Sequence, residues 1–160
     1  MHLLRTLRLF AVAGLLLAAT AFAADTYKPG DTLTAFTVKD QHDQPYAFVP
    51  GPRIVLVSFV MGVGKEANGY FAKQPADFLA QHQAIFIANI HGMPGIGRFF
   101  ALPKMKKYPH RILLGDDEHL LDRYPSQEDK LTVLHLDSAA KITAVEFVAA
   151  SNLPAVFASP

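Results

Sequence analysis

Hydrophobic and polar positions along the chain follow blocks of strand and helix length. Ile54 to Val60 and Ala84 to Ile90 are continuous apolar runs, typical of strands that are covered on both faces. Residues 64–82 between them predict a helix that breaks or restarts at Pro75, because proline suits the first turn of a helix. The pattern therefore begins as strand, helix and strand.

Shorter segments on either side complete the pattern. Residues 33–38 and 46–49 flank a turn-rich connection at 40–45, which indicates an N-terminal hairpin. A Gly/Pro-rich loop at 91–97 then leads into an apolar and later basic segment that ends at Pro109. The further elements that we expect are a strand at 111–114, a short helix or turn at 118–124, two hairpin strands at 131–136 and 142–148, and a terminal helix at 152–158 with Asn152 as its N-cap and Pro154 in its first turn.

This order predicts an α/β fold, a three-layer sandwich with a mixed central sheet and an N-terminal β-hairpin. Long crossovers through helices make the early strands parallel, and the tight late hairpin makes the last pair antiparallel. The chain has no internal repeat. We therefore expect a single domain after the N-terminal segment.

The predicted order resembles the thioredoxin-like superfamily in its peroxiredoxin and TlpA-type form. The residues that carry the resemblance are Ile54 to Phe59 and Leu134 to Asp137, which precedes the last turn. The resemblance implies a Cys-x-x-Cys pair after the first of these strands in redox-active relatives. There the helix dipole and free backbone N–H groups lower the pKa of the thiol.

This chain departs from that pattern because it contains no cysteine. Counting from Phe59, Gly64 and Ala67 stand about where the pair would be. The cis-proline that faces the pair in the family would precede Thr132, and Leu131 or a neighbour stands there instead. Thiol–disulfide and peroxidatic activities are therefore excluded.

A second resemblance rests on a pattern in the middle of the chain. The segment Met93 to Phe99 follows the strand that ends at Ile90, and Lys106 to Pro109 and the hairpin at 131–145 come after it. This order is similar to that of the YtfJ-like family of small periplasmic proteins. The resemblance implies the fold and the compartment, and no chemistry.

The N-terminal segment reads as a secretory signal peptide. Arg5 and Arg8 precede the apolar run from Leu9 to Ala21, and small residues at Ala21 and Ala23 suit a signal peptidase. The run is short for a membrane span, which needs about 20 residues. We therefore expect a signal peptide at 1–23 with cleavage near Ala23, a cysteine-less domain at 24–160 in the periplasm, and no stable membrane anchor after cleavage.

Cleavage also changes the charge of the chain. Loss of Arg5 and Arg8 lowers the 15 Lys and Arg residues to 13, against 14 Asp and Glu. The sequence pI of about 8.0 therefore describes the precursor, and no nucleic-acid partner is indicated.

The Gly/Pro loop at 91–97 is the main candidate for binding. It follows the carboxyl end of a buried parallel strand, where α/β sheets usually place ligands, and free glycine N–H groups hold anions. It matches neither the dinucleotide fingerprint nor a P-loop, so no cofactor is expected, and a loop that needs positive φ and a rigid proline is the alternative. The candidate ligand or partner surface comprises Met61, Gly64, Lys65, Glu66, His91, Met93, Pro94, Gly95, Gly97 and Arg98.

Basic residues and histidines offer two further candidates. A basic docking patch for an acidic partner or a phosphate-bearing surface comprises Lys104, Lys106, Lys107 and Arg111, with Phe99, Phe100 and Tyr108 interleaved. Charge runs of this kind are more often solvated faces. No histidine pair has the spacing of a preformed metal site, and His91 with Met93 is the weak candidate for one.

We expect from the sequence a non-catalytic binding or accessory protein of the periplasm with an envelope protein as partner. The alternative is a metal- or cofactor-dependent oxidoreductase that uses His91, Met93 and the Gly/Pro loop. Enzymatic activity without a thiol stays open, although no acid–base pair or nucleophile motif supports it.

Overall fold

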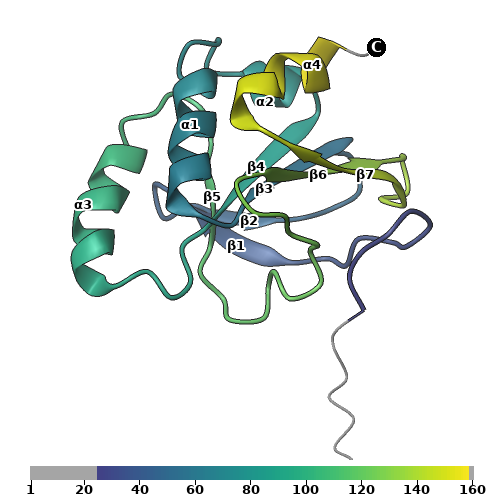
Figure 1. Cartoon of the computed structure of the whole chain (residues 1–160), viewed down its shortest axis with the longest axis horizontal. Helices are drawn as coiled ribbons and strands as arrows, with labels where there is room; N and C mark the ends of the chain where they lie inside the picture. The colour runs from purple at the N-terminus through teal and green to yellow at the C-terminus, as the bar shows by residue number, and fades with distance from the viewer. Residues whose placement is uncertain (1–24, 159–160) are drawn as a thin grey trace, which may run out of the picture.

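A computed structural model of the protein describes residues 25–158, and the predicted signal peptide at 1–23 lies outside them. Within the described range, seven strands form one mixed sheet in the order β2-β1-β5-β4-β3-β6-β7 (Figure 1). The strands are β1 (Thr37–Asp40), β2 (Pro45–Ala47), β3 (Ile54–Ser58), β4 (Ala84–Asn89), β5 (Leu113–Gly115), β6 (Leu131–Leu136) and β7 (Ile142–Val148).

The centre of the sheet is made by β3 and β4, which pair in parallel. β5 pairs in parallel with β4, whereas β6 is antiparallel to β3 and β7 is antiparallel to β6. The predicted parallel early strands and antiparallel late hairpin are therefore confirmed. Val55, Leu56 and Val57 are inaccessible to solvent because both faces of β3 are covered, which explains the continuous apolar run.

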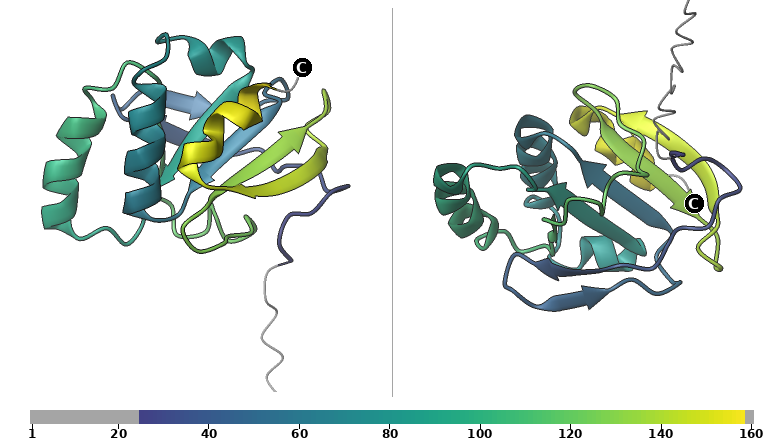
Figure 2. Two further views of the ribbon diagram at one scale, coloured as in Figure 1. Left: turned by 45° about the horizontal axis from the view of Figure 1, so that its top comes forward. Right: turned by 90° about the horizontal axis from the view of Figure 1, so that it is seen from below.

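Helices cover one face of this sheet (Figure 2). They are α1 (Met61–Phe71), α2 (Phe78–Gln81), α3 (Gly95–Met105), the 3-10 turn η1 (Ala150–Asn152) and α4 (Leu153–Ala158). Phe71, Leu79, Met105 and Leu153, one from each α-helix, belong to a single hydrophobic core with Phe86 of β4. In the part of the chain that the structure describes, no helix is long and apolar enough to cross a membrane.

The opposite face of the sheet is covered by irregular chain. Tyr27 from the N-terminal segment and Tyr124 from the turns before β6 pack edge to face, with ring centroids 5.1 Å apart. Both belong to a second core that contains Val55 and Ile87. The α/β class, the mixed sheet and the N-terminal hairpin are confirmed, while the third layer contains no helix among residues 25–158.

The strands of the hairpin and β5 differ from the predicted ranges. The first hairpin strand was expected from residue 33, but Leu33 N donates to Ala140 O and thereby joins the turn before β7. β1 therefore starts only at Thr37, and β2 ends at Ala47. β5 begins two residues later and ends one residue later than the predicted strand at 111–114.

The helix boundaries also need correction. α1 begins at Met61, three residues earlier than predicted. Pro75 lies in the connection before α2, where its carbonyl accepts from Phe78 N. α3 begins at Gly95, inside the predicted loop at 91–97, because a proline immediately before a helix and glycines in its first turn are compatible with helix formation.

Candidate functional site

Most residues of the predicted ligand or partner surface lie at one edge of the sheet. β3 and β4 are parallel, so their carboxyl ends lie at the same edge, where α1 and α3 begin. The two helices then run side by side over the same face of the sheet (Figures 1 and 2). We call this region, residues 60–66 and 91–98, the strand-end edge. It is the position at which open α/β sheets place ligands.

The start of α1 carries apolar side chains. Val60 precedes the helix in an extended conformation and forms no side-chain cap. Val60 and Met61 are both exposed, whereas Val63 is buried. Lys65 and Glu66 are exposed on the next turn, without a hydrogen-bond or ion-pair partner among residues 25–158. Lys65 and Glu66 are therefore the ionisable side chains that the helix start presents.

Gly64 and Ala67 lie deeper in α1 than the count from Phe59 predicts. They are the fourth and seventh residues of the helix, and both are buried. A Cβ at Gly64 would come within 3.0 Å of Ser58 Oγ, so the glycine lets α1 approach the end of β3 closely. The count was therefore wrong by about one helical turn, and Gly64 packs inside rather than contributing to an accessible surface.

Arg98 holds the loop between β4 and α3 in place. Its guanidinium donates to Met93 O at 3.2 Å and to Ile90 O at 3.1 Å. It also forms a two-point ion pair with Asp116, after β5, in which Nη1 lies 2.6 Å from Oδ2. Hydrogen bonding by Arg98 holds the pKa of Asp116 below its ordinary value. Arg98 was predicted as part of a binding surface, and its hydrogen bonds give it a structural role.

His91 and Met93 are both set by local contacts. His91 N donates to Asn89 Oδ1 at 3.0 Å, and His91 Nδ1 lies 3.2 Å from Asp116 O. Met93 is half-buried, and a Cβ at Gly97 would come within 3.2 Å of its Cγ. The space for the methionine therefore depends on the missing side chain at Gly97.

The glycines of this segment have different roles. Gly92 alone among those at 91–97 has positive φ, +73°, in a turn where Met93 N donates to Ile90 O. Gly95 and Gly97 are helical. Among residues 25–158, no group of three or more His, Cys, Asp or Glu side chains has the arrangement of a metal site.

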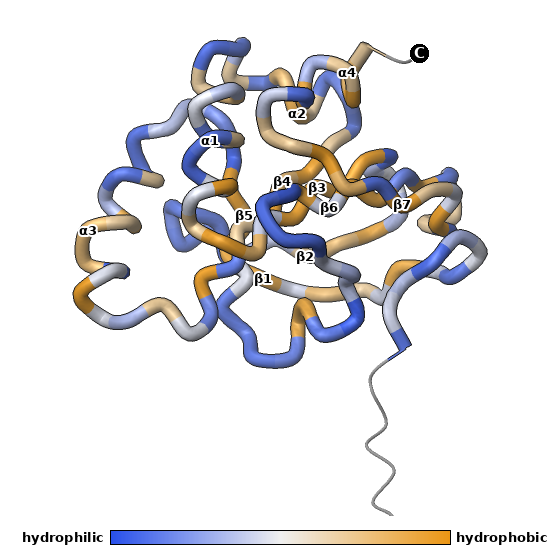
Figure 3. Tube along the Cα trace, in the orientation of Figure 1, coloured by the Kyte–Doolittle hydropathy of each residue, from blue (hydrophilic) through white to orange (hydrophobic). Residues whose placement is uncertain are grey.

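Sequence reasoning named Phe99 and Phe100 only as aromatic residues within the basic patch and missed the helix α3 whose outer face they form. Ile96, Phe99 and Phe100 are 70%, 72% and 58% exposed, and the two phenylalanine rings contact each other edge to face at 5.3 Å. Figure 3 shows hydrophobic positions along this helix at the outside of the molecule. Exposed apolar side chains that gather on one surface mark interaction sites in soluble domains.

The predicted basic patch is divided by the fold. Lys106 Nζ lies 3.2 Å from Asp43 Oδ2, and Arg111 Nε lies 2.9 Å from Asp40 Oδ2. Burial alone would raise the pKa of Asp40, but bonds from two backbone amides and Arg111 bring that pKa below its ordinary value. Lys104 and Lys107 instead line a groove on α3 with Phe99 and Phe100 among others.

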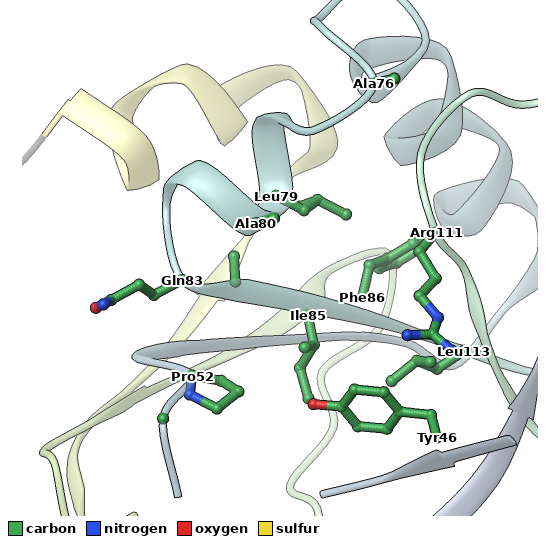
Figure 4. A pocket seen from close by; sticks show the side chains of 12 residues that line it. Tyr46, Pro52, Ala76, Leu79, Ala80, Gln83, Ile85, Phe86, Arg111 and Leu113 are labelled. Atoms are coloured by element: carbon green, nitrogen blue, oxygen red, sulfur yellow. The ribbon is translucent and has the colours of Figure 1, made fainter. Parts of the chain in front are cut away.

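Arg111 faces a separate cavity of about 420 Å³ (Figure 4). The cavity lies beside the first half of β4, which β5 does not reach because its pairing begins at Ile87. Tyr46 and Ile85 form part of its wall, and the guanidinium of Arg111 lies 5.2 Å from the centre of the Tyr46 ring. This position separates Arg111 from the other members of the predicted patch.

A buried polar pair connects α1 with the segment before β5. His110 Nε2 is 2.9 Å from Asn68 Oδ1, and its ring contacts Phe71 and Tyr108. The histidine is 1% exposed, and burial lowers its pKa to about 4. No sequence signal joins these residues, since 42 positions separate His110 from Asn68.

Comparison with known proteins supports the fold class. No protein-family model and no curated sequence matches the chain. Solved structures do: the thioredoxin domain of a thiol-disulfide oxidoreductase from Bacteroides vulgatus is similar, with a TM-score of 0.56 at 16% identity over 82% of this chain and 96% of that one.

Two mycobacterial proteins are similar in the same way. Peroxidoxin BcpB from Mycobacterium tuberculosis has a TM-score of 0.53 at 15% identity, over 81% of this chain and 93% of its own. AhpC from the same organism has a TM-score of 0.53 at 16% identity, over 82% and 95%. At such identities the likeness concerns the fold alone. The protein is a cysteine-less member of the thioredoxin-like fold class.

Proposed function

We propose that the protein is exported to the periplasm and acts there as a non-catalytic binding or accessory protein. It binds an envelope protein through the outer face of α3 and the neighbouring start of α1. In this proposal the domain keeps the thioredoxin-like framework and uses it to present a docking surface.

The observation that carries this proposal is the exposed apolar face of α3. Ile96, Phe99 and Phe100 are exposed together on one helix, whereas most other large hydrophobic side chains of residues 25–158 are buried or half-buried. Met61 and Val60 add exposed apolar surface at the start of the adjacent helix. An uncovered surface of this kind is costly unless a partner covers it.

The compartment and the finer family assignment belong to the same proposal. The N-terminal pattern supports export with cleavage near Ala23. The segments Met93 to Phe99 and Lys106 to Pro109 support membership of the YtfJ-like family. Fractionation of producing cells and N-terminal sequencing of the processed protein test both export and the cleavage site.

Capture of partners from the envelope tests the docking role. The exported protein is used as bait in its native form and as Phe99→Ser/Phe100→Ser, with Phe147→Ser as the matched control. Phe147 is also exposed but lies on β7, at the other end of the sheet. We expect a specific partner with the native protein and the control, and its loss with the α3 variant.

Two results would contradict the proposal. One is a partner retained equally by all three proteins, which would place binding elsewhere. The other is robust turnover of a peroxide or of another thiol-independent substrate by the purified protein, which would make it an enzyme.

A further inference from the structure

α3 presents one composite face to solvent. Ile96, Phe99, Phe100 and Pro103 are spaced by three and four residues, so they lie on one side of the helix. All four are exposed, whereas Met105 on the other side is buried in the core. The helix therefore carries an apolar stripe that faces water in addition to Leu102 and Met105, which pack against the core.

Two lysines extend this face. Lys104 and Lys107 line a shallow groove of about 690 Å³ together with Phe99, Phe100 and Pro103. Lys104 lies in the last turn of the helix, and Lys107 follows the helix end. The groove also includes Arg98, which is paired with Asp116, so its unpaired positive charge lies towards the helix C-terminus, beyond the two phenylalanines.

The protein does not neutralise this charge itself. No acidic residue occurs between Asp77 and Asp116. The other cations of the segment each pair with a carboxylate from elsewhere in the fold: Arg98 with Asp116, Lys106 with Asp43 and Arg111 with Asp40. Across residues 25–158, neither Lys104 nor Lys107 has an ion-pair partner. The unpaired cations of this segment are thus the two that line the apolar groove.

We propose that this α3 groove binds an acidic, amphipathic segment of a partner protein. Apolar side chains of the segment pack against Phe99 and Phe100, and carboxylates that follow them pair with Lys104 and Lys107. Such complementarity gives register and specificity as well as attraction. This inference rests on the proposed function and specifies the chemistry of its partner.

The arrangement of charge favours a protein segment over a lipid surface. A helix that lies in a bilayer interface places its cations on a polar face opposite the buried apolar one. Here the lysines follow the phenylalanines along the same groove. A second copy of α3 fits less well, because it would bring further lysines and no carboxylate.

The test uses the exported protein and a synthetic helical probe. The probe carries leucines spaced by three and four residues, followed by two glutamates, and a matched peptide has glutamines in place of the glutamates. Binding of both is measured by fluorescence anisotropy at low and high salt. We expect the glutamate peptide to bind about tenfold more tightly than the glutamine peptide and to lose this advantage at high salt.

Two charge-reversed proteins complete the design. Lys104→Glu/Lys107→Glu should abolish the preference for the glutamate peptide. Lys73→Glu/Lys141→Glu makes the same change in net charge at exposed sites outside the groove and should keep the preference. Equal binding of the two peptides by the native protein, or a preference that survives reversal at 104 and 107, would overturn the proposal.

Two other occupants of the α3 groove, a lipid surface and a second copy of the chain, would give different results. Co-sedimentation with vesicles of phosphatidylglycerol and phosphatidylethanolamine that is lost in Phe99→Ser/Phe100→Ser would assign the groove to lipid. Dimerisation on sedimentation that is lost in Phe99→Ser would assign it to a second copy. Envelope capture separates this inference from the proposed function: capture that is lost with Phe99→Ser/Phe100→Ser but unchanged by lysine reversal would overturn the acidic partner while leaving the docking role intact.

Discussion

α1 and α3 have the same length, 11 residues, and begin at the same edge of the sheet, yet they use their apolar side chains in opposite ways. α1 directs Val63, Ala67 and Phe71 into the core. α3 buries Met105 and leaves Phe99 and its neighbours in water. The start of α1 exposes Val60 and Met61, and the larger exposed apolar face lies on α3.

The largest expected difference between the helices is in stability. Phe71→Ala removes a fully buried ring from the core, and we expect it to lower the free energy of unfolding by about 3–5 kcal/mol. Phe99→Ala should change it by less than about 0.5 kcal/mol. Urea unfolding of both variants checks this contrast. Similar losses for the two would show that α3 is packed as tightly as α1 and that its exposed face is not free.

The second prediction concerns the pH dependence of stability that results from the buried His110. The pKa of His110 is lowered to about 4 in the folded protein, whereas it is about 6.5 in the unfolded chain. Between these values the unfolded state binds the extra proton, so stability is complete above pH 6.5 and is lost as the pH falls towards 4. We expect a loss of about 2–3 kcal/mol across this window.

His110→Gln is the matched control for that titration, because glutamine keeps a donor for Asn68 and cannot be protonated. Unfolding free energies measured from pH 7 to pH 4 should be flatter for this variant than for the native protein. His119 acts in the opposite direction, since its bond to Asp122 raises its pKa, but it remains in both proteins. Identical pH profiles would mean that His110 does not stay neutral in the fold.

The third prediction concerns Arg98, which holds the loop between β4 and α3. Arg98→Met removes the ion pair to Asp116 and two bonds to loop carbonyls. Part of the side chain is solvated, so we expect a loss of about 1–2 kcal/mol. Hydrogen exchange should become faster at residues 91–94 and unchanged in β6. An exchange increase spread over the whole sheet would instead identify Arg98 as part of the global core.

Sequence patterns predicted the regions where local pattern and tertiary packing agree. The apolar runs of β3 and β4 and the late hairpin were placed correctly, because strands buried on both faces require continuous hydrophobic sequence. The sequence did not predict α3 because four of its residues or neighbours have low helix propensity: Pro94, Gly95, Gly97 and Pro103. Pro103 is tolerated inside it because the Phe99 carbonyl that loses its partner lies on the exposed side.

The contacts that define the candidate site could not be read from the sequence because they are distant in it. Lys106 and Asp43 are 63 positions apart, and Arg98 and Asp116 are 18 apart. These ion pairs form only when the sheet has folded. The sequence alone therefore does not show which cations are paired and which are unpaired. The sequence identified the basic residues of this segment. The fold determines which of them are paired with carboxylates and which remain free to bind a partner.

The smallest expected effect tests this separation directly. Lys106→Ala removes a cation that pairs with Asp43 across an exposed gap of 3.2 Å, and such surface pairs contribute little. We expect a change in unfolding free energy within about 0.5 kcal/mol and no change in affinity for the glutamate peptide. Lys107→Ala should be equally silent in stability but weaken that affinity two- to threefold, because its charge is not used within the fold. If Lys106→Ala weakened binding as much as Lys107→Ala, the whole basic segment would act as one field, and the distinction between paired and unpaired lysines would have no bearing on recognition.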